Sequence, residues 1–219
     1  MDELDESLEL SNAEMRLYSR QILLDGWDIE AQEKLKLANV LIVGCGGIGC
    51  MTAELLARAG VGQITLIDAD TIEVSNLQRQ IAYVENNVGF YKAEVLAQRL
   101  KQINPYIKVH AYAVKLDTAN ASSLILGQDL VLDGCDNFTT RYLVNQQCKA
   151  ANVHSSVHLP LVFKGSCLWW KVSPLAMNVC SRKKNKRVKA YAVQIREFSP
   201  PRQTCWPVFK RTMHSYIWV

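Results

Sequence analysis

No apolar run in this sequence of 219 residues reaches the length of a transmembrane helix. The amino-terminal stretch MDELDESLELSNAEMRLYSRQ is acidic and polar, so we expect no signal peptide. The seven cysteines occur without a secretory signal, which is more typical of reduced thiols than of disulfides. We therefore expect a cytoplasmic protein that has no membrane partner.

Acidic residues are almost missing from residues 160–219. This segment holds the single acid Glu197 and 12 lysines and arginines, whereas residues 1–159 hold 20 acidic and 13 basic residues. Four of the five tryptophans and five of the six prolines also lie after Leu159. Such an abrupt change in composition indicates two parts of different origin or different function.

Short apolar runs alternate with segments of helical spacing up to residue 159. The runs NVLIVG, QITLIDAD and DLVLDGCDN predict buried strands, and IGCMTAELLARAG and YKAEVLAQRLKQIN predict helices. Nearer the amino terminus, Asn12 is expected to cap a helix that ends before Gly26. Strands that alternate with helices predict an α/β fold, Rossmann-like, with a mostly parallel sheet and helices on both faces.

A glycine loop follows the first predicted strand and opens a helix. Its sequence GCGGIG places Gly44, Gly46 and Gly49 in the pattern G-x-G-x-x-G, which lets the backbone approach phosphates at a helix amino terminus. Asp68 ends the second strand, where its carboxylate can accept hydrogen bonds from ribose hydroxyls. These features predict a nucleotide site, and they fit an NAD-dependent oxidoreductase as well as an enzyme that uses ATP.

Polar and charged side chains in two further loops favour ATP. The segment DADTIEVSNLQRQ carries Asp70, Ser75, Asn76, Arg79 and Gln80. Arg79 and Lys92 suit a triphosphate, because phosphoryl transfer adds charge to phosphate oxygens. Asp136 follows another strand and can hold Mg²⁺ through oxygen. Singly, Arg79 and Lys92 could be surface charges and Asp136 a helix N-cap; together these residues predict nucleotidyl transfer.

Five stretches within residues 11–159 resemble the MoeB/ThiF/HesA family, the bacterial relatives of ubiquitin-activating enzymes. They are RLYSRQILLDG, VLIVGCGGIG, RAGVGQITLIDADTIEVSNLQRQ, VGFYKAEVLAQRLKQINP and DLVLDGCDNFTTRYLVN. The resemblance implies an adenylyltransferase that uses ATP and Mg²⁺. Its substrate would be the C-terminal glycine of a ubiquitin-fold sulfur carrier ending in Gly-Gly, similar to MoaD or ThiS, in molybdopterin or thiamin biosynthesis. The resemblance also implies a homodimer.

The resemblance further implies which residues bind the nucleotide. They are Gly47, Asp68, the run Ser75, Asn76, Leu77, Gln78 and Arg79, and then Lys92, Asp136 and Asn137. Arg20 is implied to reach across the homodimer to phosphates bound by the other subunit. No residue is needed as a nucleophile, because the carrier carboxylate attacks the α-phosphorus. Arg20, Arg79 and Lys92 would stabilise the phosphate charge while Asp136 holds Mg²⁺.

Paired cysteines are missing from residues 160–219, where the family should carry a zinc site. Cys167, Cys180 and Cys205 are isolated, so we expect no structural zinc in this chain. The remaining cysteines are expected to be small buried hydrophobic side chains; they are Cys45, Cys50, Cys135 and Cys148.

Residues 160–219 can also be interpreted as an out-of-frame translation. Tryptophan has one codon, so Trp169-Trp170 must be TGGTGG. Read one base earlier, the DNA permits AIGFQGQLFMVE and then the family-like motif PCYECLFP. We hypothesise that one base is missing near Leu159, so that residues 1–159 form a truncated ATP-binding adenylation domain. The tail of residues 160–219 would then be irregular and the activity impaired.

Two alternatives to an adenylating enzyme stay open at this point. One is a non-catalytic nucleotide-binding remnant with a basic tail, since the tail contains RKKNKRVK. Such runs are usually solvated, and we expect no nucleic-acid partner. The other alternative is an NAD-dependent oxidoreductase, against which Arg79 and Lys92 argue.

Overall fold

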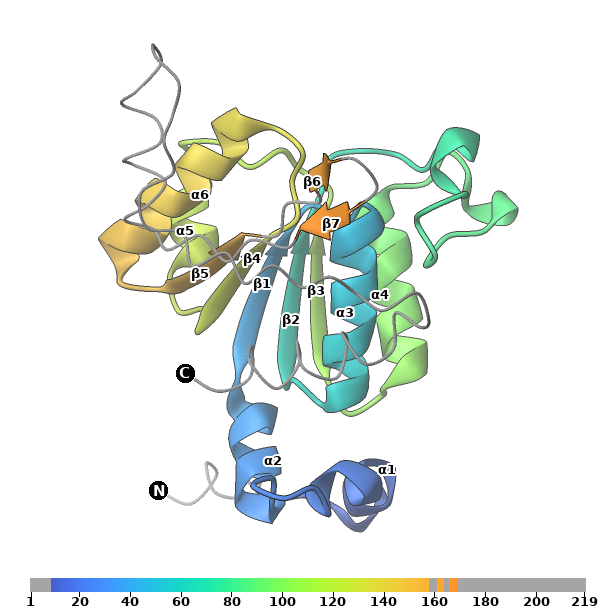
Figure 1. Cartoon of the computed structure of the whole chain (residues 1–219), viewed down its shortest axis with the longest axis vertical. Helices are drawn as coiled ribbons and strands as arrows, with labels where there is room; N and C mark the ends of the chain where they lie inside the picture. The colour runs from blue at the N-terminus through green and yellow to red at the C-terminus, as the bar shows by residue number, and fades with distance from the viewer. Residues whose placement is uncertain (1–8, 158–160, 164–165, 169–219) are drawn as a thin grey trace.

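Helices and strands alternate along the chain in the computed structural model, which describes residues 9–157, 161–163 and 166–168 (Figure 1). In chain order the main elements are α1 (Asn12–Ile22), α2 (Ile29–Leu37), β1 (Asn39–Val43), α3 (Gly47–Ala59), β2 (Gln63–Ile67), α4 (Lys92–Ile103), β3 (Lys108–Tyr112), α5 (Ala121–Ile125), β4 (Leu130–Asp133), α6 (Phe138–Ala151) and β5 (His154–Val157). Two short 3-10 helices, η1 (Val74–Asn76) and η2 (Glu85–Asn87), lie between β2 and α4. The predicted α/β alternation is confirmed.

The five main strands form one parallel sheet in the order β3-β2-β1-β4-β5. The central strand β1 pairs with β2 on one side and with β4 on the other. From β1 the chain adds β2 and β3 on one side, and it then crosses back to add β4 and β5 on the other side. Loops after β1 and β4 diverge at this reversal, and in such folds ligands bind there, beyond the carboxyl ends of the strands. The Rossmann-like prediction is confirmed.

Helices cover both faces of the sheet, and alternate residues of each strand point to opposite faces. On the face of α3 and α4, Ile42 and Ile64 are buried in one hydrophobic cluster. On the face of α5 and α6, Leu41 and Val131 are buried in a second cluster. Figure 1 shows the two helix pairs on the two sides of the sheet. Burial on both faces explains why these strands read as continuous apolar runs.

Helices α1 and α2 lie at the end of the sheet where β1 begins (Figure 1). The capping residue of α1 is Ser11, whose hydroxyl accepts a hydrogen bond from the backbone N–H of Glu14. The Glu14 carboxylate in turn accepts from the backbone N–H of Ser11 at 2.9 Å. The predicted cap at Asn12 is therefore wrong by one residue, because only Ser11 has a glutamate at the spacing that completes a capping box.

A short hairpin follows the main sheet. Strands β6 (Leu161–Phe163) and β7 (Ser166–Leu168) pair in antiparallel fashion. They lie inside the tail of residues 160–219 that we predict to be irregular. Residues 169–219, with Cys180 and Cys205, lie outside the described residues, so the out-of-frame origin and the missing zinc site stay predictions. In the described ranges, no helix is long and apolar enough to cross a membrane.

Candidate functional site

The glycine loop is pressed between β1, α3 and the loop after β4. Gly44 has φ +91°, and a Cβ placed on it would lie 3.0 Å from the carbonyl oxygen of Gly134. A Cβ placed on Gly49 would lie 1.8 Å from the carbonyl oxygen of Gly44. Gly44 and Gly49 are thus required for close backbone packing. The close packing of these two glycines fixes the conformation of residues 45–48, where a nucleotide would bind.

The amino end of α3 forms the part of the site that suits an anion. Gly46 is the N-cap of this 13-residue helix and provides no side-chain cap, so the first backbone N–H groups lack that acceptor. Unpaired N–H groups and the helix dipole favour negative charge at this position. The segment between β2 and α4 packs against this helix end, because a Cβ on Gly47 would lie 3.3 Å from the carbonyl oxygen of Arg79.

Asp68 ties the glycine loop to the loop after β2. One carboxylate oxygen accepts from the backbone N–H of Cys45 at 2.7 Å, and the other accepts from that of Asp70 at 2.8 Å. Burial raises the pKa of the Asp68 carboxyl, although both hydrogen bonds oppose the rise. Each oxygen retains a second lone pair. Asp68 thus holds the loop and keeps lone pairs that could accept a hydroxyl, and its role toward a ribose stays a prediction.

Lys92 begins α4 and is buried, although its partner is not. Its ammonium lies 2.8 Å from Oδ2 of Asp70, with side-chain exposures of 8% for Lys92 and 71% for Asp70. An exposed carboxylate is a weak partner, since water competes for it. A bound phosphate could therefore replace Asp70 as the partner of this ammonium. The interpretation of Lys92 as a surface charge is wrong.

Tyr83 fixes this arrangement, and the sequence analysis missed it. Its hydroxyl donates to the carbonyl oxygen of Cys45 at 2.7 Å and lies 3.3 Å from that of Lys92. Burial raises the pKa of Tyr83 far above its ordinary value, so the phenol stays neutral and can donate. One side chain thereby links the glycine loop to the start of α4. The sequence carries no clear signal for it, because its partner Cys45 lies 38 residues away along the chain.

The run from Ser75 to Arg79 folds around η1. Asn76 is buried, and its Oδ1 accepts from the backbone N–H of Glu73 at 3.2 Å. Arg79 is exposed, and its Nη1 donates to the carbonyl oxygen of Ser75 at 3.1 Å. Leu77 packs its side chain against the hydrophobic cluster under α3 and α4. Asn76 therefore shapes the turn, Arg79 remains available to a ligand, and the side chain of Leu77 is used for packing.

Asp136 and Asn137 lie between β4 and α6 and have different roles. Asn137 is the N-cap of α6, since its Oδ1 accepts from the backbone N–H of Thr140 at 2.8 Å. Asp136 is exposed and makes no hydrogen bond within the part of the chain that the structure describes. The N-cap interpretation of Asp136 is therefore wrong. Its free carboxylate suits a hard cation such as Mg²⁺.

A buried ion pair supports this loop, and the sequence analysis missed it as well. Nε of Arg141 lies 3.0 Å from Oδ2 of Asp133, with exposures of 4% and 0%. Arg141 also donates to the carbonyl oxygen of Cys135, whose thiol lies 2.6 Å from Oδ1 of Asp133. Burial and the nearby Asp133 carboxylate raise the pKa of Cys135 to about 12. Cys135 is thus a half-buried hydrogen-bond donor rather than a purely hydrophobic side chain; Cys45, Cys50 and Cys148 are buried, as predicted.

Arg20 is the one predicted site residue that the fold separates from the others. It lies in the last turn of α1, at the opposite end of the sheet from the glycine loop (Figure 1). Within one chain it has no route to a phosphate at the amino end of α3. The implied reach across a homodimer stays a prediction.

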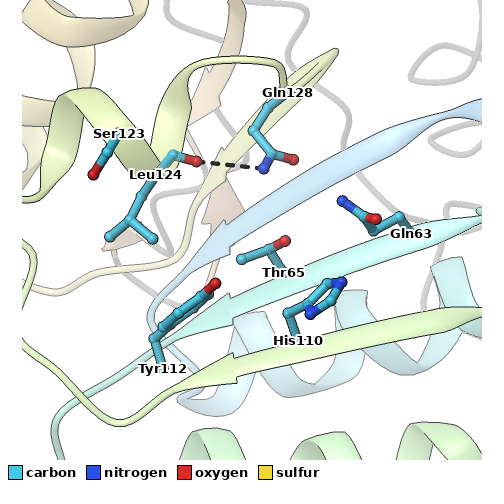
Figure 2. Close-up of a pocket in the computed structure, with 7 residues that line it drawn as sticks. All are labelled: Gln63, Thr65, His110, Tyr112, Ser123, Leu124 and Gln128. Carbon is cyan, nitrogen blue, oxygen red and sulfur yellow. Dashed lines mark hydrogen bonds between the residues drawn. The ribbon is translucent and has the colours of Figure 1, made fainter.

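A separate cleft of ≈ 160 Å³ opens on the face of the sheet that α5 and α6 share (Figure 2). Its lining residues are Gln63, Thr65, His110, Tyr112, Ser123, Leu124 and Gln128. None of the predicted site residues lines it. The cleft also lacks the backbone N–H groups and the cations of the glycine loop, so we do not include it in the nucleotide site.

Known proteins are similar to this chain in sequence. The ThiF family model matches residues 18–205, a range that runs past Leu159, where we expected the resemblance to end. The molybdopterin-synthase adenylyltransferase of Salmonella typhimurium is 49% identical over 145 residues, which cover 66% of this chain and 58% of that protein. The sulfur carrier protein adenylyltransferase of Thermus thermophilus is 46% identical over 132 residues, which cover 60% and 49%. The chain thus spans about half the length of these relatives.

Solved structures share the fold. A structure titled TcdA (CsdL) superposes with a TM-score of 0.66 at 31% identity, covering 70% of this chain and 61% of that one. The E. coli tRNA N6-threonylcarbamoyladenosine dehydratase TcdA in complex with ATP superposes with a TM-score of 0.65 at 31% identity, covering 68% and 62%. A structure of the same enzyme with AMP gives a TM-score of 0.66.

Proposed function

This chain belongs to the ThiF family, and from that premise we propose that it adenylates a ubiquitin-fold sulfur-carrier protein with ATP. Relatives named as adenylyltransferases of molybdopterin synthase and of a sulfur carrier support this proposal, as do neighbours solved with ATP and AMP. The observation that carries it is Lys92: a buried ammonium that is paired, among the described residues, with an exposed carboxylate. It begins a helix that Tyr83 links to the glycine loop.

The described residues offer a binding role for each part of ATP. Backbone N–H groups at Gly46 and Gly47 would hold phosphate oxygens, and Asp68 would accept the ribose hydroxyls. Lys92 would exchange Asp70 for a phosphate, because a triphosphate carries more charge than one carboxylate. Asp136 has the free oxygen donors that Mg²⁺ prefers, and a bound ion would neutralise charge on the phosphates.

The reaction needs positioning and charge stabilisation rather than a protein nucleophile. The carrier's terminal carboxylate attacks the α-phosphorus, the bond to the β-phosphate oxygen breaks, and pyrophosphate leaves while the acyl-adenylate forms. Lys92 and Arg79 would stabilise the charge that builds up on the phosphate oxygens. Burial raises the pKa of the thiols of Cys45 and Cys50, and it raises that of Cys148 to about 11. These neutral thiols are poor nucleophiles, which supports a mechanism without a covalent enzyme intermediate on them.

The partner that we propose is a carrier of the molybdopterin-synthase type that ends in Gly-Gly. The names of the relatives favour this carrier over a thiamin carrier. We also propose that two copies of the chain associate, since Arg20 lies far from the glycine loop of its own chain and would act in a partner's site. If residues 160–219 are translated out of frame, we expect the turnover of the enzyme to be impaired. The coding DNA decides whether this segment is in frame or out of frame.

Exchange of labelled pyrophosphate into ATP tests the proposal. The full chain is incubated with ATP, Mg²⁺ and a ubiquitin-fold carrier ending in Gly-Gly. We expect exchange that requires the carrier and that disappears with a carrier lacking its last glycine. Exchange that ignores the carrier, or tight binding of NADH with no binding of ATP, would contradict the proposed function.

A further inference from the structure

Gln80 is a buried amide that lacks a partner for its oxygen. Its side chain is 4% exposed, and Oε1 has no hydrogen-bond partner among the described residues. Leaving a buried polar atom unpaired costs about 1–3 kcal/mol. Such groups are rare in folded proteins, so each one calls for a physical reason.

The position of Gln80 gives that reason. A Cβ placed on Gly46 would lie 3.9 Å from Nε2 of Gln80, so the amide faces the uncapped amino end of α3. The backbone of Gln80 is fixed, since its N–H donates to Asn76 at 3.0 Å and its carbonyl oxygen accepts from Tyr83 at 3.1 Å. The side chain is therefore held at the anion site by its own turn and cannot move away from it at low cost.

The neighbouring amide Asn76 behaves differently. Its Oδ1 accepts from the backbone of Glu73, and its Nδ2 lies 3.4 Å from the hydroxyl of Ser75. Asn76 thus completes its contacts inside its own turn, which is a structural role. Gln80 leaves its oxygen unpaired in a place where methionine would fill the same space without an unpaired polar atom.

We propose that Gln80 is a further nucleotide-binding residue, which contacts the phosphates at the amino end of α3. Its Nε2 donates to a phosphate oxygen, and its Oε1 accepts from a water molecule that hydrates the phosphates. The neutral amide fits this place because a carboxylate of the same shape would repel the anion. This inference rests on the proposed function, since it requires ATP to bind at the glycine loop.

The variant Gln80→Met tests the proposal, with Gln128→Met as its matched control. Gln128 also has a buried Oε1 without a partner in the described part of the chain, but it lies at the cleft between the sheet and α5 (Figure 2). Each full-length variant is measured for melting temperature without nucleotide and for the Kd of ATP·Mg²⁺. We expect Gln80→Met not to lower the melting temperature, because it removes an unpaired polar atom. Gln128→Met also removes the 3.3 Å hydrogen bond from Nε2 to the carbonyl oxygen of Leu124, so it should lower the melting temperature slightly. Gln80→Met should raise the Kd of ATP about tenfold or more, and Gln128→Met should leave it unchanged.

Two further measurements separate binding from structure. Gln80→Glu keeps the shape and adds a negative charge, so it should weaken ATP binding more than Gln80→Met does. In pyrophosphate exchange, both Gln80 variants should raise the KM for ATP and leave the KM for the carrier unchanged. A Gln80→Met protein that melts earlier and binds ATP as tightly as the wild type would overturn the inference and leave the proposed function intact. If the wild-type chain does not bind ATP, the proposed function fails and the inference fails with it.

Discussion

Two buried amides, Asn104 and Gln80, lie in two regions of the molecule that are built differently. Asn104 is fully buried where α1 meets the ends of α3 and α4. Its Nδ2 donates to Tyr18 and to the carbonyl oxygen of Ala57, both at 2.7 Å, and its Oδ1 accepts from Tyr106 at 3.1 Å. Gln80, at the glycine loop, leaves its oxygen without a partner in the described residues.

The same contrast holds for the ion pairs of the two regions. Glu14, on α1, is buried, and it combines an ion pair to Lys36 at 3.1 Å with two hydrogen bonds from Ser11. Lys92, at the glycine loop, has one carboxylate partner that is mostly exposed. In the region of α1 and α2 the polar groups pair with one another and stabilise the fold. At the glycine loop, polar groups stay available to a ligand.

The largest expected effect comes from Lys92→Met. Removal of one preorganised charge beside the phosphates should lower the rate of carrier-dependent pyrophosphate exchange by about 10²–10³-fold. The folded state should lose little, because the partner of Lys92 is exposed and returns to water. Exchange kinetics and urea denaturation of the same preparation check both parts. A loss of stability that matches the loss of activity would remove the contrast between the two regions.

Glycines at the two ends of the sheet allow a matched comparison. A Cβ on Gly49 would lie 1.8 Å from the carbonyl oxygen of Gly44, and a Cβ on Gly62 would lie 1.6 Å from that of Lys36. Gly49→Ala and Gly62→Ala should each lower the free energy of unfolding by about 1–3 kcal/mol or more, because packed backbone must shift. Only Gly49→Ala should also raise the Kd of ATP. Equal Kd values for the two variants in titrations below their melting temperatures would break the comparison.

The sequence predicts the fold and most of the candidate site residues, but it does not reveal contacts between residues that are distant along the chain. The glycine pattern and Asp68 were predicted because each follows a strand, and strand ends meet at one edge of a parallel sheet. Arg79 and Lys92 were predicted because their positive charge suits a triphosphate. Tyr83 was missed because its partner Cys45 lies 38 residues away, and spacing along the chain does not reveal such contacts. The unpaired oxygen of Gln80 could not be predicted either, because it depends on which donors the folded chain places near this oxygen.

A smaller effect is expected from Asn104→Leu. The substitution leaves the hydroxyl of Tyr18 and the carbonyl oxygen of Ala57 without their donor, which should destabilise the fold by about 1–3 kcal/mol. The Kd of ATP should not change, because Asn104 lies far from the glycine loop. Chemical denaturation and ATP titration check this pair of outcomes. A weaker affinity for ATP at full stability would show that the two regions are coupled.

The smallest effect concerns pH. Burial raises the pKa of Glu14, but hydrogen bonds from Ser11 and the ion pair with Lys36 outweigh it, so the pKa lies below its ordinary value. Glu14 therefore stabilises the fold above its unfolded pKa of about 4.3 and loses this contribution as pH falls through its lower folded pKa. Glu14→Gln should flatten the acid side of the stability profile by about 1 kcal/mol or less. An unchanged slope in acid denaturation would mean that the Ser11 and Lys36 contacts contribute nothing.

Hydrogen exchange of the full-length chain, with and without ATP·Mg²⁺, tests the central claim most directly. If ATP binds at the glycine loop, backbone amides of residues 44–49 and 75–80 should exchange more slowly in its presence. Amides of residues 60–63 and 104–108, at the other end of the sheet, should exchange at the same rate in both samples. Slower exchange at residues 60–63 and 104–108, with no change at residues 44–49, would contradict the account.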